Sequence, residues 1–212
     1  MERSVKARLV NGSDRAVAPR FERTGRRRRN QDSHAGAAAF VESGYNGTSL
    51  RDVAARAGLS HTGLLHHFPD KPALLEAVLD DRLNGPAYIL PLDSDDGEVF
   101  IRALVDLAEL NMHDRANIAL LTILSAEAVT PGHPAHDYFK RWHARVRDHI
   151  AAAFKDLHSR GRFHSPVSPE LAALHVSAMR DGLNLAWLLA PDEIHLADTV
   201  RAQFRVYVDL ED

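Results

Sequence analysis

Apolar residues recur along this chain at the spacing of helices. They return at intervals of three and four, the turn signals between them are short, and no useful length alternates with period two. We therefore predict an all-α fold. The predicted helices lie within 33–45, 48–58, 61–68, 71–83, 97–112, 117–129, 134–163, 169–192 and 195–210. The first is expected to end near Gly44, and Asp70 can cap the helix at 71–83.

Two of these helices are short and are joined by the glycine-containing turn "AGLS". Ser49 and Asp52 have capping-box spacing, Gly58 is expected to stop the first helix, and Ser60 to cap the second. Such a pair is typical of a helix-turn-helix, whose second helix reads bases in the major groove. Three exposed positions of that second helix would face the bases: His61, Thr62 and His66.

Charge is distributed unevenly along the chain. Residues 1–30 hold ten Lys/Arg against three Asp/Glu, whereas residues 31–80 carry a net −3 and residues 81–212 a net −7. The basic segment ends in Arg26, Arg27, Arg28 and Arg29 and has no helical period, so we predict that it is disordered when free. It is either a solvated leader or an arm that follows DNA phosphates or enters a minor groove. We place domain boundaries after residues 30 and 80.

Composition excludes several classes of protein. The chain has no cysteine, which rules out disulfides, thiolate zinc sites and cysteine nucleophiles. It has no apolar run of the roughly 18 residues that span a bilayer, and its start lacks the apolar core of a signal peptide. We therefore expect a cytoplasmic protein without a membrane partner.

The histidines allow one enzymatic alternative. In "HPAH", His133 and His136 lie three apart and could bind a metal together with His143 or Glu127. They lie in a turn rich in proline and glycine, and the chain has neither an HExxH motif, a glycine-rich phosphate loop nor a nucleophile elbow. We therefore expect no catalytic residue, no metal and no cofactor.

The run "AFVESGYNGTSLRDVAARAGLSHTGLLHHFPDKPALLEAVL", residues 39–79, resembles the DNA-binding domain of the tetracycline-repressor (TetR) family of bacterial transcription regulators. The resemblance implies a three-helix DNA-binding domain followed by a helical ligand-binding and dimerisation domain. By position, it implies DNA contacts or helix caps beside phosphates at Thr48, Ser49, Ser60, His61, Thr62, Gly63, His66, His67 and Lys71.

Two departures from the family pattern stand out. Leu65 takes the place of the usual aromatic residue, so a hydroxyl that reaches a phosphate is missing. Asp32 and Ser33 stand where the family favours an apolar pair near the start of the first helix.

The C-terminal domain resembles the family in architecture alone. Family members pair their last two helices with those of a second copy, and the small residues Ala178 and Gly182 would let a helix approach closely. Packing of these helices within one chain is the alternative. The expected dimer interface contains Leu171, Leu174, Ala178, Gly182, Leu185 and Phe204.

The resemblance also implies a small-molecule effector that changes the spacing of two recognition helices and so releases a palindromic DNA operator. The candidate pocket residues combine apolar walls with polar anchors, although each could instead be a core residue. They are Met112, His113, Leu120, Ile123, Leu124, Glu127, Tyr138, Trp142, His175 and Met179.

These observations favour a homodimeric, sequence-specific DNA-binding repressor whose effector is unidentified. An activator or dual regulator of the same family is the first alternative. A sequence-tolerant DNA binder dominated by the basic segment is another, and it would show steep salt dependence with little preference among duplexes.

Overall fold

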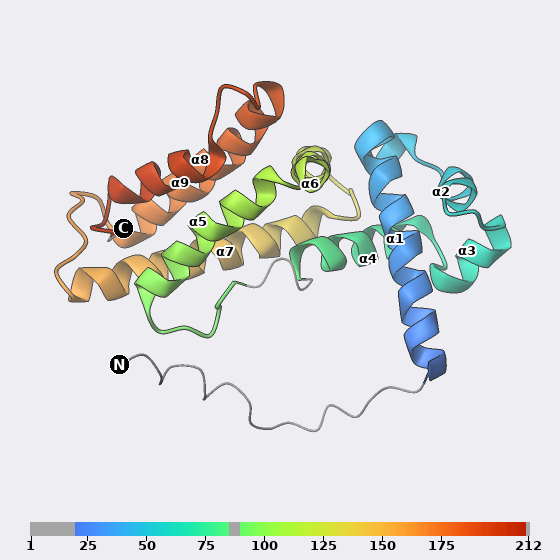
Figure 1. The fold of residues 1–212 in the computed structure, drawn as a ribbon, viewed down its shortest axis with the longest axis horizontal. Helices are drawn as coiled ribbons and strands as arrows, with labels where there is room; N and C mark the ends of the chain where they lie inside the picture. The colour runs from blue at the N-terminus through green and yellow to red at the C-terminus, as the bar shows by residue number, and fades with distance from the viewer. Residues whose placement is uncertain (1–19, 85–89, 211–212) are drawn as a thin grey trace, which may run out of the picture.

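The computed structural model describes residues 20–84 and 90–210, with side chains from residue 32 onward. Over these residues the chain forms nine α-helices and no β-strand, which confirms the predicted all-α fold (Figure 1). The helices are α1 (Arg20–Gly47), α2 (Leu50–Arg56), α3 (His61–His67), α4 (Lys71–Leu83), α5 (Gly97–Met112), α6 (Arg115–Glu127), α7 (His136–Ser159), α8 (Pro169–Leu189) and α9 (Leu196–Arg205).

The first four helices form a small domain at one end of the molecule (Figure 1). Its helix starts follow the predicted caps. Ser49 and Asp52 form a capping box, the Ser60 hydroxyl accepts a hydrogen bond from the Gly63 N–H at 3.0 Å, and Asp70 caps α4. These caps satisfy amide groups that a helix start leaves unpaired.

The first helix ends as predicted but begins earlier. The backbone leaves helical geometry at Gly44, with φ 66° and ψ −179°. At the other end, α1 starts at Arg20, so the expected start at residue 33 was too late and the boundary after residue 30 lies inside α1. Arginine and glutamate are good helix formers, and extending an existing helix avoids the cost of nucleation. The rest of the predicted arm, residues 1–19, lies outside the described residues.

Helices α5, α7, α8 and α9 pack against one another and enclose the second hydrophobic core. Ile150, Phe154 and Leu157 of α7 lie in its centre, fully buried. The core explains why α7 and α9 are strongly one-sided in sequence, since each buries a single apolar face.

Helix α6 belongs to both cores. Its Leu120 and Leu124 pack with the N-terminal helices, whereas Ile118 packs with the C-terminal ones. The sequence predicted a central helix here because apolar residues surround it on all sides. The boundary expected after residue 80 lies inside α4, and it does not separate the hydrophobic cores.

Among the described residues, none of the helices combines the length and the apolar character that crossing a bilayer requires.

Candidate nucleic-acid interface and effector pocket

The outer surface of α3 carries polar side chains that no other helix covers. His61, Thr62 and His66 are exposed, while Leu64 and the following Phe68 are fully buried. A helix of seven residues is too short to be stable alone, so its two buried anchors and the Ser60 cap hold it in place. The predicted base-facing residues are thus available for contact from a supported helix.

Two neighbouring positions of the predicted DNA-binding set lie near helix starts. Ser49 is exposed at the start of α2, where its hydroxyl bonds the Asp52 carboxylate at 2.6 Å. Gly63 lies one turn into α3, and its N–H is occupied by the Ser60 hydroxyl.

Three other residues in the predicted DNA-binding set are turned into the domain. The Thr48 hydroxyl donates to the carbonyls of Gly44 and Ala39, at 2.7 and 3.1 Å, and the residue is buried. Lys71 places its Nζ 4.3 Å from the centre of the Tyr45 ring, and burial lowers the pKa of this lysine. Without DNA, both side chains thus make contacts within the domain, and the phosphate contacts expected for Thr48 and Lys71 stay predictions.

His67 is the third inward residue. Its Nδ1 pairs with the carboxylate of Asp32 on α1, and the Asp32 side chain is only 6% exposed. Asp32 stands where the family favours an apolar residue, and its partner His67 lies on α3. His67 therefore links α3 to α1, and its DNA contact stays a prediction.

Arg26, Arg27, Arg28 and Arg29 have helical backbone within α1, and their side chains lie outside the described part of the structure. Their predicted role toward DNA stays a prediction.

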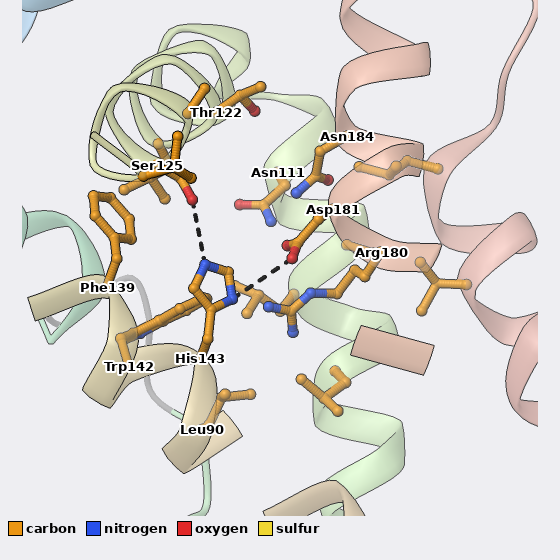
Figure 2. Close-up of a pocket in the computed structure, with 18 residues that line it drawn as sticks. Leu90, Asn111, Thr122, Ser125, Phe139, Trp142, His143, Arg180, Asp181 and Asn184 are labelled. Atoms are coloured by element: carbon orange, nitrogen blue, oxygen red, sulfur yellow. Dashed lines mark hydrogen bonds and ion pairs between the residues drawn. The ribbon is translucent and has the colours of Figure 1, made fainter. Parts of the chain in front are cut away.

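A cavity of about 260 Å³ opens between α5, α6, α7 and α8 (Figure 2). Its walls are mostly aliphatic and aromatic, with Phe139 and Trp142 on α7 and several leucines opposite. Its polar groups gather in one part of the lining and come from four helices. They are Asn111, Thr122, Ser125, His143, Arg180, Asp181 and Asn184.

His143 is at the centre of these polar groups. Its Nε2 lies 3.3 Å from the Ser125 hydroxyl of α6, and its Nδ1 lies 3.5 Å from the Asp181 carboxylate of α8 (Figure 2). Arg180 lies over the Trp142 ring at 5.5 Å. Ser125, His143 and Asp181 thus pair with one another, and a ligand would exchange hydrogen bonds with this set while filling the apolar part.

The order serine, histidine, aspartate resembles a hydrolase triad. In a triad the carboxylate is buried and close to the imidazole, because it must fix the imidazole's tautomer. Here the Asp181 side chain is 48% exposed and stands 3.5 Å away. The geometry therefore fits a binding anchor better than a nucleophile.

The structure brings few of the predicted pocket residues together at this cavity. Of the ten candidates only Trp142 lines it. On α6, Leu120 and Leu124 point into the N-terminal core, whereas Leu121 and Ser125 face the cavity. One residue along a helix turns the side chain by about 100°, so a shift of one position replaces the wall.

The remaining candidates have other surroundings. Met112 and Met179 pack against the C-terminal core, and His113 caps the end of α5 in an exposed position. Ile123 is half-buried on α6 outside the cavity lining. The other three make polar contacts: Glu127 with the Tyr45 N–H, Tyr138 with Asp80 and Asn84, and His175 with the Tyr207 hydroxyl.

Most of the expected dimer residues form an exposed stripe on α8. Leu171, Leu174 and Leu185 are 42, 47 and 49% exposed, and Ala178 and Gly182 lie between them on the surface. Phe204 is corrected, because it is fully buried within its own chain and packs against Phe154.

The two histidines of "HPAH" form hydrogen bonds with different backbone groups. His133 accepts from the Ala135 N–H, and His136 contacts the Ala128 carbonyl. The part of the chain that the structure describes contains no group of three side chains placed to bind a metal ion.

Solved structures share this fold. NalD, a repressor of the MexAB-OprM multidrug efflux pump in Pseudomonas aeruginosa, is 21% identical with a TM-score of 0.66, covering 87% of this chain and 97% of NalD. SmeT, repressor of the SmeDEF multidrug efflux pump of Stenotrophomonas maltophilia, is 18% identical with a TM-score of 0.64, covering 85% of this chain and 90% of SmeT.

Sequence relatives are regulators as well. The transcriptional regulator TtgR of Pseudomonas putida is 25% identical over 169 residues, which is 76% of this chain and 80% of TtgR. An uncharacterised helix-turn-helix regulator of Mycobacterium bovis, Mb2274c, is 28% identical over 75 residues. This chain covers 40% of the length of that mycobacterial relative.

Two family models match the chain. The model of bacterial regulatory proteins of the tetR family matches residues 34–78, which include the helix-turn-helix. The model of the C-terminal domain of BetI-type transcriptional repressors matches residues 100–211, more than half of the chain. The chain therefore belongs to the TetR family of bacterial transcriptional regulators.

Proposed function

We propose that this protein is a cytoplasmic transcriptional repressor that binds a palindromic DNA operator as a homodimer. The observation that carries the proposal is the exposed, capped recognition helix, with His61, Thr62 and His66 on its free surface. Phosphate contacts near Ser49 and the basic run of α1 would position that helix, since phosphate contacts fix register and base contacts give specificity.

The dimer is supported by the exposed stripe on α8. Five of its residues, from Leu171 to Leu185, follow one another at steps of three or four, so they share one face of the helix. Such a contiguous apolar face is unusual on a monomer's surface and typical of a helix-helix interface. A twofold pairing of this face would present two recognition helices to two half-sites.

The cavity supports release by a small molecule. Its apolar walls and few converging polar groups are the features of a ligand site. At about 260 Å³ it suits a compact, largely apolar molecule with one or two hydrogen-bonding groups. A SmeT structure contains triclosan, a compound of that description, which makes triclosan the first effector to test here.

The proposal is tested by gel-shift binding of the full chain to the DNA upstream of its own gene, at two salt concentrations. We expect specific retention over scrambled duplex, lost in the Thr62→Ala and His61→Ala variants and kept in a variant of the exposed His113. Equal retention of both duplexes with a steep salt dependence would instead support the sequence-tolerant binder.

A further inference from the structure

A hydrogen bond between residues far apart in sequence ties the end of α1 to the end of α6. The backbone N–H of Tyr45, just past the kink of α1, donates to Oε2 of Glu127 at 2.7 Å. Tyr45 precedes the helix-turn-helix by four residues, and Glu127 is the last residue of α6. The bond therefore links the DNA-binding domain directly to a helix of the pocket.

The backbone of α1 is shaped for this contact. Gly44 has a φ of 66°, and a Cβ built there would collide with the Glu127 carboxylate. Glycine is thus required both for the conformation and for the close approach of the carboxylate.

The Tyr45 side chain is held by two more elements. Lys71 of α4 lies over its ring, and the His133 ring of the loop between α6 and α7 meets it edge-on at 4.9 Å. Burial raises the pKa of Tyr45 and lowers the pKa of His133, so the surroundings favour the neutral form of both. Helices α1, α4 and α6 therefore all meet at one residue.

The same end of α6 forms the pocket wall. Ser125 and Ala126 line the cavity directly before Glu127, and Val129 lines it two residues after. A helix moves as a rigid body over so few residues, so displacement of this wall must displace the Glu127 carboxylate as well.

We propose that Glu127 is a positioning residue that transmits occupancy of the pocket to the DNA-binding domain through its hydrogen bond with Tyr45. In the empty protein the bond holds the end of α1, and with it α2 and α3, in one orientation. A ligand that moves the end of α6 weakens the bond and loosens these helices. The regulatory meaning rests on the proposed function, but the coupling itself exists without DNA.

Hydrogen-deuterium exchange of the full chain, read by mass spectrometry over residues 45–68, tests the contact without an operator. Glu127→Ala should accelerate exchange there roughly five- to tenfold, the factor for one lost hydrogen bond. Glu127→Gln keeps an accepting oxygen and should stay close to the native protein, and the exposed Glu109→Ala is the matched control. Native-like exchange in Glu127→Ala would overturn the proposal.

The link to the pocket is tested by filling the cavity from the opposite side. Asn184→Phe on α8 should accelerate exchange over residues 45–68 in the native background and add little in Glu127→Ala. Thr122→Leu is the milder filler if Asn184→Phe does not fold. Additive effects, or no effect of a folded filler, would refute transmission through Glu127. Absence of operator binding alongside non-additive exchange would refute the proposed function and leave the coupling intact.

Discussion

The pairing of Asp32 with His67 gives the recognition helix a directional contact. Leu64 and Phe68 anchor α3 by apolar burial, which tolerates small rotations, whereas a carboxylate paired with an imidazole does not. Asp32 is nearly buried, so it depends on this partner for its hydrogen bonding.

His67→Leu should therefore destabilise the protein by about 1–3 kcal/mol, because it leaves a buried carboxylate unpaired. The double variant with Asp32→Leu should recover most of that loss, since an apolar pair replaces both polar groups. Urea unfolding measures the stability of the single and the double variant. His66→Leu, at the exposed position one residue earlier, is the control. An equal loss of stability in His67→Leu and His66→Leu would contradict this role of His67.

Gly44 and Gly58 form a matched pair of glycines. Their φ angles are 66° and 69°, but only Gly44 faces a neighbour, the Glu127 carboxylate, while a Cβ at Gly58 meets open space. Both φ angles strain an alanine, and at Gly44 the ψ of −179° and the collision add to that strain.

Gly44→Ala should cost at least about 1 kcal/mol more stability than Gly58→Ala, because it adds backbone strain and loses the Tyr45–Glu127 hydrogen bond. The excess should shrink by about 1 kcal/mol when both glycine variants are compared in a Glu127→Ala background. Thermal and urea unfolding give the comparison, and equal losses in the native background would show that the collision is relieved without breaking the bond.

Helix α5 is tied to the segment after α7 by an ion-pair cluster. The Glu98 carboxylate accepts hydrogen bonds from Arg162 at 2.5 Å and from Arg102 at 2.7 Å. These bonds hold the pKa of Glu98 below its usual range. Because the folded pKa is lower than the unfolded one, the unfolded chain binds more protons in mild acid.

The contribution of Glu98 to stability should therefore be complete above about pH 5 and lost as pH falls toward the lowered pKa. Glu98→Gln should reduce the melting temperature at neutral pH and flatten its decline in acid. Melting curves between about pH 3 and pH 7 give this slope. Glu109→Gln, at an exposed position, should keep the native dependence of melting temperature on pH. If Glu98→Gln keeps it too, the loss of stability in acid comes from other groups.

The assembled protein is expected to depend on the α8 stripe. Leu174 on the stripe and Val99 on α5 are 47 and 48% exposed, so a charge at either site disturbs a single chain to a similar degree. Only Leu174 lies on the proposed dimer face.

Leu174→Glu should convert the dimer to a monomer in sedimentation velocity and weaken operator binding at least tenfold, because one recognition helix then binds alone. Val99→Glu should remain dimeric. Dissociation in both variants, or in neither, would place the interface elsewhere.

The order and type of the helices were determined by the sequence alone. Periods of three and four, the caps at Ser49, Ser60 and Asp70, and the stop at Gly44 are local signals, and the structure confirms each of them. Helix starts without a cap signal are less well marked in a sequence. The predicted start of α1 at residue 33 therefore differs from the observed start at Arg20.

Which face of a helix meets which neighbour was decided only by the tertiary structure. Helix α6 is apolar all round, so its sequence does not distinguish Leu120, in the N-terminal core, from Leu121, in the pocket wall. The roles of Glu127, His67 and Lys71 depend equally on partners distant along the chain. Periodicity is a property of neighbouring residues, whereas these contacts arise when separate helices pack, and no local pattern encodes the partner.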